Sequence, residues 1–146
     1  MRLALDEART ARDMGEVPVG AVIVLDDVII GRGHNVVEST HDATAHAEMM
    51  ALRDAADAFG NQRLNDATIH VTLEPCAMCI GALILSRIGT VVFGARDPKF
   101  GACGSVVNLL SSDLAWNHSV EVVEGIMSDE SAELLRGFFE RLRARQ

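Results

Sequence analysis

The first third of the chain contains two kinds of hydrophobic pattern. Residues 1–14 repeat apolar side chains at intervals of three and four, which is the spacing of one buried helix face. A continuous apolar run follows over 19–25, and a second run over 28–31 comes after the turn Asp26-Asp27. Two short apolar runs around such a turn are typical of a β-hairpin. The pattern therefore predicts a helix followed by a hairpin.

The rest of the chain mixes helical and extended patterns. The further expected elements are helices at 45–59, 76–86 and around 134–142, and strands at 68–73, 90–94 and 120–123. Helices interspersed with strands are typical of a layered α/β domain. A length of 146 residues fits one domain, so we expect a single α/β domain over residues 1–146.

The helix expected at 76–86 is apolar on nearly every side. A helix of this kind is buried on more than one side. In so small a domain, a second buried side indicates a contact between subunits as well as a core. We therefore expect a homodimer.

Composition indicates in which compartment of the cell the protein is expected. No apolar run reaches the ~18 residues that a membrane span needs, and the first residues lack the apolar centre of a signal peptide. Three cysteines, two of them in one short motif, do not form a disulfide framework. We expect a cytoplasmic protein that makes no contact with a membrane.

The formal net charge of −8 argues against a protein that binds nucleic acid over its whole surface, because phosphate contacts need Lys and Arg. The end of the chain differs. Its last eleven residues contain one acid, Glu140, and the cations Arg136, Arg141, Arg143 and Arg145. Two interpretations stay open: a basic patch that grips one loop of RNA, or cations that stabilise the negative end of a helix.

Two short motifs supply metal ligands and one spare carboxylate. They are His46-Ala47-Glu48 and Pro75-Cys76-Ala77-Met78-Cys79. An imidazole and two thiolates are three zinc ligands, and three protein ligands with an open fourth position are typical of a catalytic site. Zinc lowers the pKa of the water in that position from about 15.7 to about 7. Glu48 is not needed as a metal ligand and is available as a general acid and base.

The N-termini of two expected helices would bring the side chains of both motifs together. Pro75 suits the first turn of a helix, where Cys76 and Cys79 would share one face. Thr44 is the expected N-cap of the preceding helix. His46 and Glu48 do not share a helix face, so they meet only at a point beyond the helix N-terminus.

Other interpretations of these residues remain open at this point. A Cys-x-x-Cys motif also occurs in redox pairs and in structural zinc sites, and Cys103 would be a fourth ligand that closes the site. Asn35, after the second strand, has an amide that can read a base, although an isolated asparagine is more often a turn former.

Longer segments extend the motifs. They are residues 16–22 (EVPVGAV), 41–48 (HDATAHAE), 71–79 (VTLEPCAMC), 86–88 (SRI) and 92–105 (VFGARDPKFGACGS). Together they resemble the bacterial tRNA-specific adenosine deaminase family, and the similarity continues to the Phe138-Phe139 helix. The resemblance implies a three-layer α/β/α cytidine-deaminase-like fold with a five-stranded mixed sheet, assembled as a homodimer.

The resemblance also implies the chemistry. His46, Cys76 and Cys79 would hold one Zn²⁺ per subunit, and Glu48 would move protons during hydrolytic deamination. The substrate would be the wobble adenosine of a tRNA anticodon stem-loop, in an arginine tRNA, which becomes inosine. The residues implied in substrate contacts are Asn35, Ala45, Asp97, Lys99, Asn117 and Phe138.

Two competing functions remain. A deaminase of free bases or nucleosides, such as guanine or cytosine, would share the zinc site, and the acidic net charge favours it. The loop at 94–105 and the basic end of the chain favour RNA. A zinc-stabilised RNA-binding module without catalysis is the second alternative, but a purely structural site has no use for Glu48.

Overall fold

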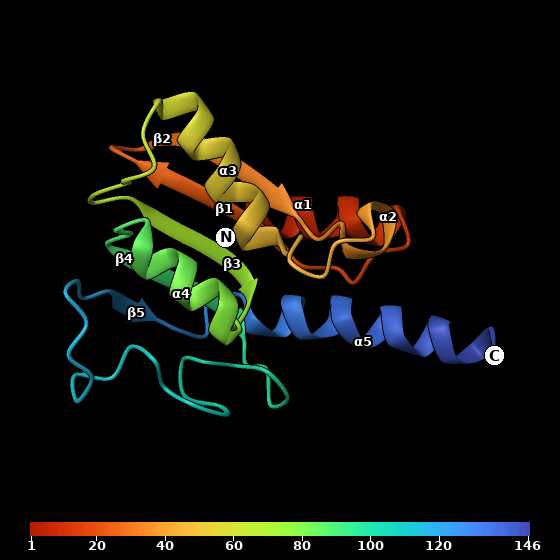
Figure 1. Ribbon diagram of the computed structural model, residues 1–146. Coiled ribbons are helices and arrows are strands. Elements are labelled where there is room, and N and C mark those ends of the chain that lie inside the picture. Colours follow the sequence, from red (N-terminus) through yellow and green to blue (C-terminus); the bar gives the residue numbers. More distant parts are fainter.

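The computed structural model describes residues 1–146, and its elements are arranged around one five-stranded sheet (Figure 1). The strands are β1 (Gly20–Leu25), β2 (Val28–His34), β3 (Thr68–Leu73), β4 (Thr90–Ala95) and β5 (Glu121–Val123). Their order in the sheet is β2-β1-β3-β4-β5. β1 runs antiparallel to β2 and β3, whereas β3, β4 and β5 are parallel. The mixed sheet predicted from the sequence is therefore confirmed.

Helices cover both faces of this sheet. They are α1 (Arg2–Asp13), α2 (Val37–Thr40), α3 (Ala47–Phe59), α4 (Ala77–Leu85) and α5 (Ser128–Ala144). α3 and α4 lie on one face, while α1 and α5 lie on the other (Figure 1). The result is the expected three-layer α/β/α arrangement. The four-residue α2 was not expected, because a single turn is too short to show a hydrophobic period. None of the helices combines the length and apolar character that crossing a bilayer requires.

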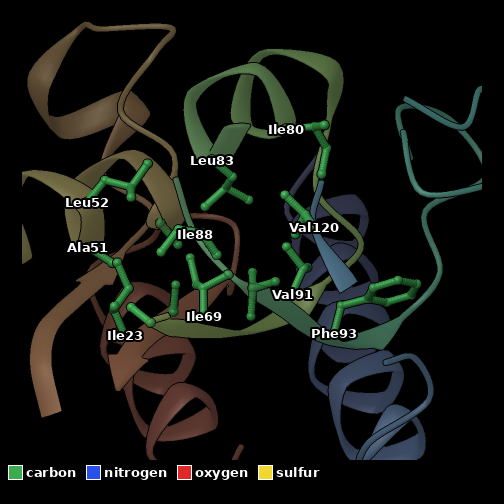
Figure 2. Close-up of a cluster of buried hydrophobic side chains, with 14 of the residues drawn as sticks. Ile23, Ala51, Leu52, Ile69, Ile80, Leu83, Ile88, Val91, Phe93 and Val120 are labelled. Carbon is green, nitrogen blue, oxygen red and sulfur yellow. The ribbon is translucent and has the colours of Figure 1, made fainter. Parts of the chain in front are cut away.

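The main core lies between the sheet and the α3–α4 layer (Figure 2). Ile69, Val91 and Phe93 point from the central strands toward this layer and are fully buried. Leu52 of α3 and Leu83 of α4 pack against them from the helices. Burial of each such side chain contributes roughly 1.5–3 kcal/mol, so the core holds both helices firmly against the sheet.

A glycine lets α3 approach β2 closely. A Cβ atom at Gly33 would lie 2.4 Å from the carbonyl oxygen of Ala47, the first residue of α3. No side chain fits between strand and helix at this point. The start of α3 therefore rests directly on β2, which fixes the position of His46 just before it.

The strand directions bring several chain segments to one edge of the sheet. β2, β3 and β4 all end at this edge, and the antiparallel β1 begins there, since Gly20 pairs with His34 and Leu73 pairs with Ala95. The carboxyl ends of sheet strands are the usual place for ligands in α/β proteins. A functional site is therefore expected at this edge of the sheet.

Both helix starts differ from the sequence prediction. α3 begins at Ala47 with His46 as its N-cap residue, not with Thr44 as the cap. The Thr44 hydroxyl and N–H donate instead to Asp42, at 2.6 and 2.8 Å, so this side chain is not available for capping. α4 likewise begins at Ala77 with Cys76 as its N-cap residue, and Pro75 lies before the helix rather than in its first turn.

Candidate metal centre and substrate cavity

Three ligand atoms from two helix starts meet at the edge of the sheet. Nδ1 of His46 lies 3.6 Å from the sulfur of Cys76 and 3.6 Å from the sulfur of Cys79. All three atoms lie within 4.8 Å of one another. His46 and Cys76 are the N-cap residues of α3 and α4, with extended backbones, and Cys79 lies in the first turn of α4. The extended backbone at His46 places its ring outside the helix, where it can share a target with Cys76.

The spacing fits zinc. A tetrahedral ion with Zn–S bonds of about 2.3 Å and a Zn–N bond of about 2.0–2.1 Å separates neighbouring ligand atoms by roughly 3.5 Å. The observed nitrogen–sulfur distances of 3.6 Å agree with that value. The imidazole lies equally close to both sulfurs, which a simple redox pair of cysteines does not require.

The two cysteine sulfurs share one proton between them. A hydrogen bond from the Cys79 thiol lowers the pKa of Cys76 to about 4. The pKa of Cys79 is raised, because this thiol donates that hydrogen bond and is buried beside the Cys76 thiolate. A divalent metal ion would offset the repulsion between two thiolates, and a coordinating thiol is deprotonated outright.

Cys103 does not complete the site. It lies outside the cluster of His46, Cys76 and Cys79, and its backbone N–H donates to Glu74. Burial raises the pKa of the Cys103 thiol to about 12, so the side chain is a small buried apolar group. The centre therefore has three protein ligands and an open fourth position, as in catalytic rather than structural zinc sites.

Glu48 lies in the first turn of α3, two residues after His46, and only 4% of its surface is exposed. Its burial raises the pKa of the carboxyl group. Glu48 lines the same cavity as His46 and Cys76. A carboxyl group with a raised pKa beside an open metal position is suited to exchange protons with a bound water.

The cavity has a volume of about 350 Å³, within the range of small-molecule sites. Its wall is formed by the segments that converge at the edge of the sheet. The lining residues are Glu16, Val17, Val19, Asn35, Val37, Glu38, His46, Ala47, Glu48, Leu73, Glu74, Cys76, Asp97 and Phe100. Apolar side chains with a few polar groups make a cavity suited to a flat heterocycle with polar edges.

Glu74 holds one wall of this cavity. Its buried carboxylate accepts hydrogen bonds from the backbone N–H groups of Asp97 (3.2 Å), Cys103 (3.0 Å) and Ser105 (3.2 Å), and from the Ser105 hydroxyl. Burial alone would raise the pKa of Glu74, but these donors hold it below its usual value. The loop after β4 is thereby tied to the residue next to Pro75.

Glu16 holds a second wall of the cavity in the same manner. Its buried carboxylate accepts the N–H groups of Glu38 (3.1 Å) and Ser39 (2.6 Å) and the Ser39 hydroxyl. The pKa of Glu16, which burial would raise, is lowered by these donors. Neither Glu16 nor Glu74 has a role that was predicted from the sequence. The only sequence feature that could have pointed to them is that each is a single acid beside an apolar stretch. Glu74 also lies directly before the metal motif Pro75-Cys76.

Asn35 lines the cavity and bridges two of its segments. Its Nδ2 donates to the carbonyl of Val17, and its Oδ1 accepts the N–H of Val37, both at 3.3 Å. An asparagine amide has two donor hydrogens and two acceptor lone pairs. One of each is used within the chain, so one donor and one acceptor remain for a ligand.

The other residues expected in substrate contacts occupy different places. Asp97 lines the cavity, and Lys99 is exposed two residues along the same loop. Ala45 is buried outside the lining, where its carbonyl accepts the N–H of Val36. Asn117 lies away from the cavity, and its Oδ1 accepts a hydrogen bond from Arg87 (2.9 Å).

Phe138 belongs to a second cavity of about 330 Å³, between the end of α1 and α5. Its ring packs edge-to-face on Phe139, with centroids 5.4 Å apart. The same cavity is lined by Arg12, Arg141 and Arg145, with Asp13 as its one acid. Asp13 is paired with Arg12, so the cavity has an excess of positive charge.

Comparisons with known proteins agree with this site. A family model described as MafB19-like deaminase matches residues 1–143. The tRNA-specific adenosine deaminase of Bacillus subtilis (strain 168) is 47% identical over 146 residues, which cover all of this chain and 90% of that relative.

Two solved structures extend the comparison. A tRNA:A34 deaminase, studied for A-to-I editing at the wobble position, matches with a TM-score of 0.88 and 46% identity, over 92% of this chain and 97% of that one. The guanine deaminase of Bacillus subtilis matches with a TM-score of 0.63 and 30% identity, over 78% of this chain and 83% of that one.

The three-layer fold and the three-ligand centre define a zinc-dependent deaminase. The Bacillus subtilis tRNA-specific adenosine deaminase is 47% identical over the whole chain, whereas the guanine deaminase is 30% identical over 78% of it. The chain belongs to the tRNA-specific adenosine deaminase family, as its motifs indicated.

Proposed function

We propose that the protein converts the wobble adenosine of a tRNA anticodon, in an arginine tRNA, to inosine with release of ammonia. The observation that carries this proposal is the buried Glu48 in one cavity with His46 and Cys76. The relatives of highest identity that we compared act on tRNA adenosine according to their names. The roles of the individual residues follow from their positions.

His46, Cys76 and Cys79 would hold the metal ion. When zinc is bound, it supplies a water whose pKa is near 7 rather than about 15.7. Glu48 would accept a proton from the attacking water and donate it to N1 of the adenine ring, and the water oxygen would bond to C6. Glu48 would then carry the remaining proton of that oxygen to the amino group on C6, so that ammonia leaves as the C6–N bond breaks and the C6 carbonyl forms. The raised pKa of Glu48 suits a group that must both accept and donate near neutral pH.

Asn35 orients the purine. The donor and the acceptor of its amide that are not used within the chain would form hydrogen bonds with the purine, whose edge also carries donors and acceptors. The carboxylates of Glu16 and Glu74 do not touch the reacting atoms, since both are occupied by hydrogen bonds from the loops beside the cavity. They are positioning residues that keep the two walls at a fixed distance.

The test is a deamination assay on an arginine-tRNA anticodon stem-loop with adenosine at the wobble position. Inosine is read as an A-to-G change in the copied DNA. We expect inosine with the wild-type protein, and turnover lower by about 10²–10⁴-fold or more in Glu48→Ala, which retains its zinc. Near-normal turnover in that variant would refute the role of Glu48.

A free-base deaminase is the second candidate, because the fold and 30% of the aligned residues are shared with a guanine deaminase. Adenosine, guanine and cytosine without RNA serve as substrates in the same assay, with ammonia release as the measurement. Ammonia from guanine together with an unchanged stem-loop would replace the tRNA proposal by this one.

We also propose that the protein is a cytoplasmic homodimer, with α4 in the interface. Its outward side carries no charged residue, and Leu85 on that side is 79% exposed. Sedimentation equilibrium tests the assembly, with Leu85→Glu expected to be monomeric. Val28→Glu on the edge strand β2, also an exposed apolar position, is the matched control and should stay dimeric. A dimeric Leu85→Glu protein would place the interface elsewhere.

A further inference from the structure

Phe100 is the one aromatic side chain among the residues that line the catalytic cavity, and it is 70% exposed. A residue that lines a cavity while most of its surface meets solvent lies at the rim. Single exposed apolar side chains are ordinary on protein surfaces. This one stands out by its place, because its ring borders the entrance to the site.

The backbone at Phe100 is fixed relative to the metal centre. The Asp97 side chain accepts the N–H groups of Lys99 (2.9 Å) and Phe100 (3.2 Å), and the Asp97 carbonyl accepts the N–H of Gly101 (2.9 Å). Gly101 in turn pairs with Cys76 as an isolated β-bridge. The backbone that carries Phe100 is thus held beside the segment of a metal ligand, which lowers the entropy cost of using the ring for binding.

We propose that Phe100 stacks on the base next to the wobble adenosine in the RNA, an inference that rests on the proposed function. An adenosine that enters a closed cavity leaves its neighbours unstacked. An exposed aromatic ring at the rim replaces part of the lost stacking. Such contacts strengthen binding by about 5- to 150-fold per base, the equivalent of about 1–3 kcal/mol.

No other aromatic side chain is placed for this contact. Phe59 ends α3, thirteen residues beyond the metal ligand at the helix start, and Trp116 donates its indole N–H to the carbonyl of Leu109 (2.7 Å) in the loop before β5. Neither lines the cavity, Phe93 is fully buried in the core, and Phe138 and Phe139 belong to α5 and do not line it either. The chain has no tyrosine. Stacking at the entrance therefore depends on Phe100.

The experiment compares variants on the wobble stem-loop under steady-state conditions. We expect Phe100→Ala to raise KM by about 5- to 150-fold with kcat within twofold of wild type. Phe100→Trp, which keeps a ring, should retain the wild-type KM, whereas Phe100→Leu, which keeps only apolar bulk, should behave as the alanine variant. Phe59→Ala, a loss of an exposed ring far from the cavity, is the matched control and should not change KM.

Abasic nucleotides identify the stacked base. A stem-loop without the base on the 5′ or the 3′ side of the wobble adenosine removes one stacking partner at a time. At one of these positions the abasic RNA should raise the wild-type KM as far as Phe100→Ala does, with no further rise when the two changes are combined.

Two results would overturn the inference. One is an unchanged KM in Phe100→Ala. The other is a Phe100→Ala effect that adds in full to the abasic effect at both positions. Failure of the proposed function gives a different result, namely no inosine from the wild-type protein on the intact stem-loop.

Discussion

The carboxylate of Glu74 accepts the backbone N–H of Cys103 at 3.0 Å, across 29 residues of sequence. The contact joins the segment that leads to the metal ligand Cys76 with the loop that presents Asp97 and Phe100. The metal centre and the substrate wall are therefore positioned by one buried acid. Changes that move this loop should alter substrate binding without touching a metal ligand.

Gly101→Ala should disturb this wall. A Cβ atom at Gly101 would lie 2.2 Å from the Glu74 carboxylate, so the loop or the acid must shift. Overpacking of this kind costs about 1–3 kcal/mol, and misplacement by about 1 Å at an active site can lower kcat/KM by roughly 10²-fold. Thermal unfolding and steady-state kinetics measure both effects.

Gly137→Ala is the control for that variant. A Cβ atom at Gly137, inside α5, meets only Arg141 at an ordinary contact distance of 3.7 Å. Alanine is favoured over glycine in a helix interior by about 1 kcal/mol, so this variant should unfold at a higher temperature than wild type. Equal stability changes in both glycine variants would contradict the role of the Glu74 contact.

Metal content should separate the three cysteines. Cys76→Ser and Cys79→Ser each remove a thiolate from the centre and should bind far less than one zinc per chain. Cys103→Ser should keep one zinc, because Cys103 lies outside the cluster. Elemental analysis after dialysis against a weak chelator gives the stoichiometry. Loss of zinc from the Cys103 variant would mean a four-ligand, structural site.

Glu16→Gln should destabilise the protein in a pH-dependent way. The pKa of Glu16 is lowered in the folded state, so its carboxylate adds stability above the unfolded-state pKa, about 4.3, and this stability is lost as pH falls through the folded-state pKa. An amide in its place cannot accept from all the donors at Ser39 and Glu38. We expect a loss of about 1–3 kcal/mol at pH 7.

Urea unfolding at several pH values measures this difference. As pH falls through the lowered pKa of Glu16, the wild-type carboxyl group also becomes protonated, so the gap between wild type and Glu16→Gln should narrow. Zinc release at low pH affects both proteins and cancels in the comparison. A gap that stays constant from pH 7 to pH 3 would mean that Glu16 stabilises the fold by packing alone.

Arginines at the α1–α5 cavity should contribute to RNA binding through phosphate contacts. No ion pair occupies Arg141 or Arg145 in the structure. If each contacts one phosphate, replacement by alanine should reduce the slope of log KM against log salt by about 1, while kcat stays unchanged. Arg63→Ala, an exposed arginine in the segment after α3, is the control. Identical salt slopes in all variants would favour the simpler view that these cations stabilise a helix end.

The local pattern of the sequence determined the order of the elements and the ligand triad. Hydrophobic periods locate helices and strands because burial repeats every 3.6 or 2 residues. The i, i+3 spacing of Cys76 and Cys79 places both on one side of a helix start wherever the helix lies. The caps were predicted less well, because Asp42 competes for Thr44 and two of the three metal ligands, His46 and Cys76, sit at N-cap positions with extended backbones.

Only the tertiary structure decided which distant residues share the cavity. The hydrogen bonds of Glu16 and Glu74, and that between Arg87 and Asn117, join segments 22 to 31 residues apart. The place of Phe100 at the rim depends on such contacts. The order of the strands and the packing of loops set these contacts, and neither leaves a period in the sequence. The sequence thus determined the chemistry of the centre, while the structure determined the walls that select what reaches it.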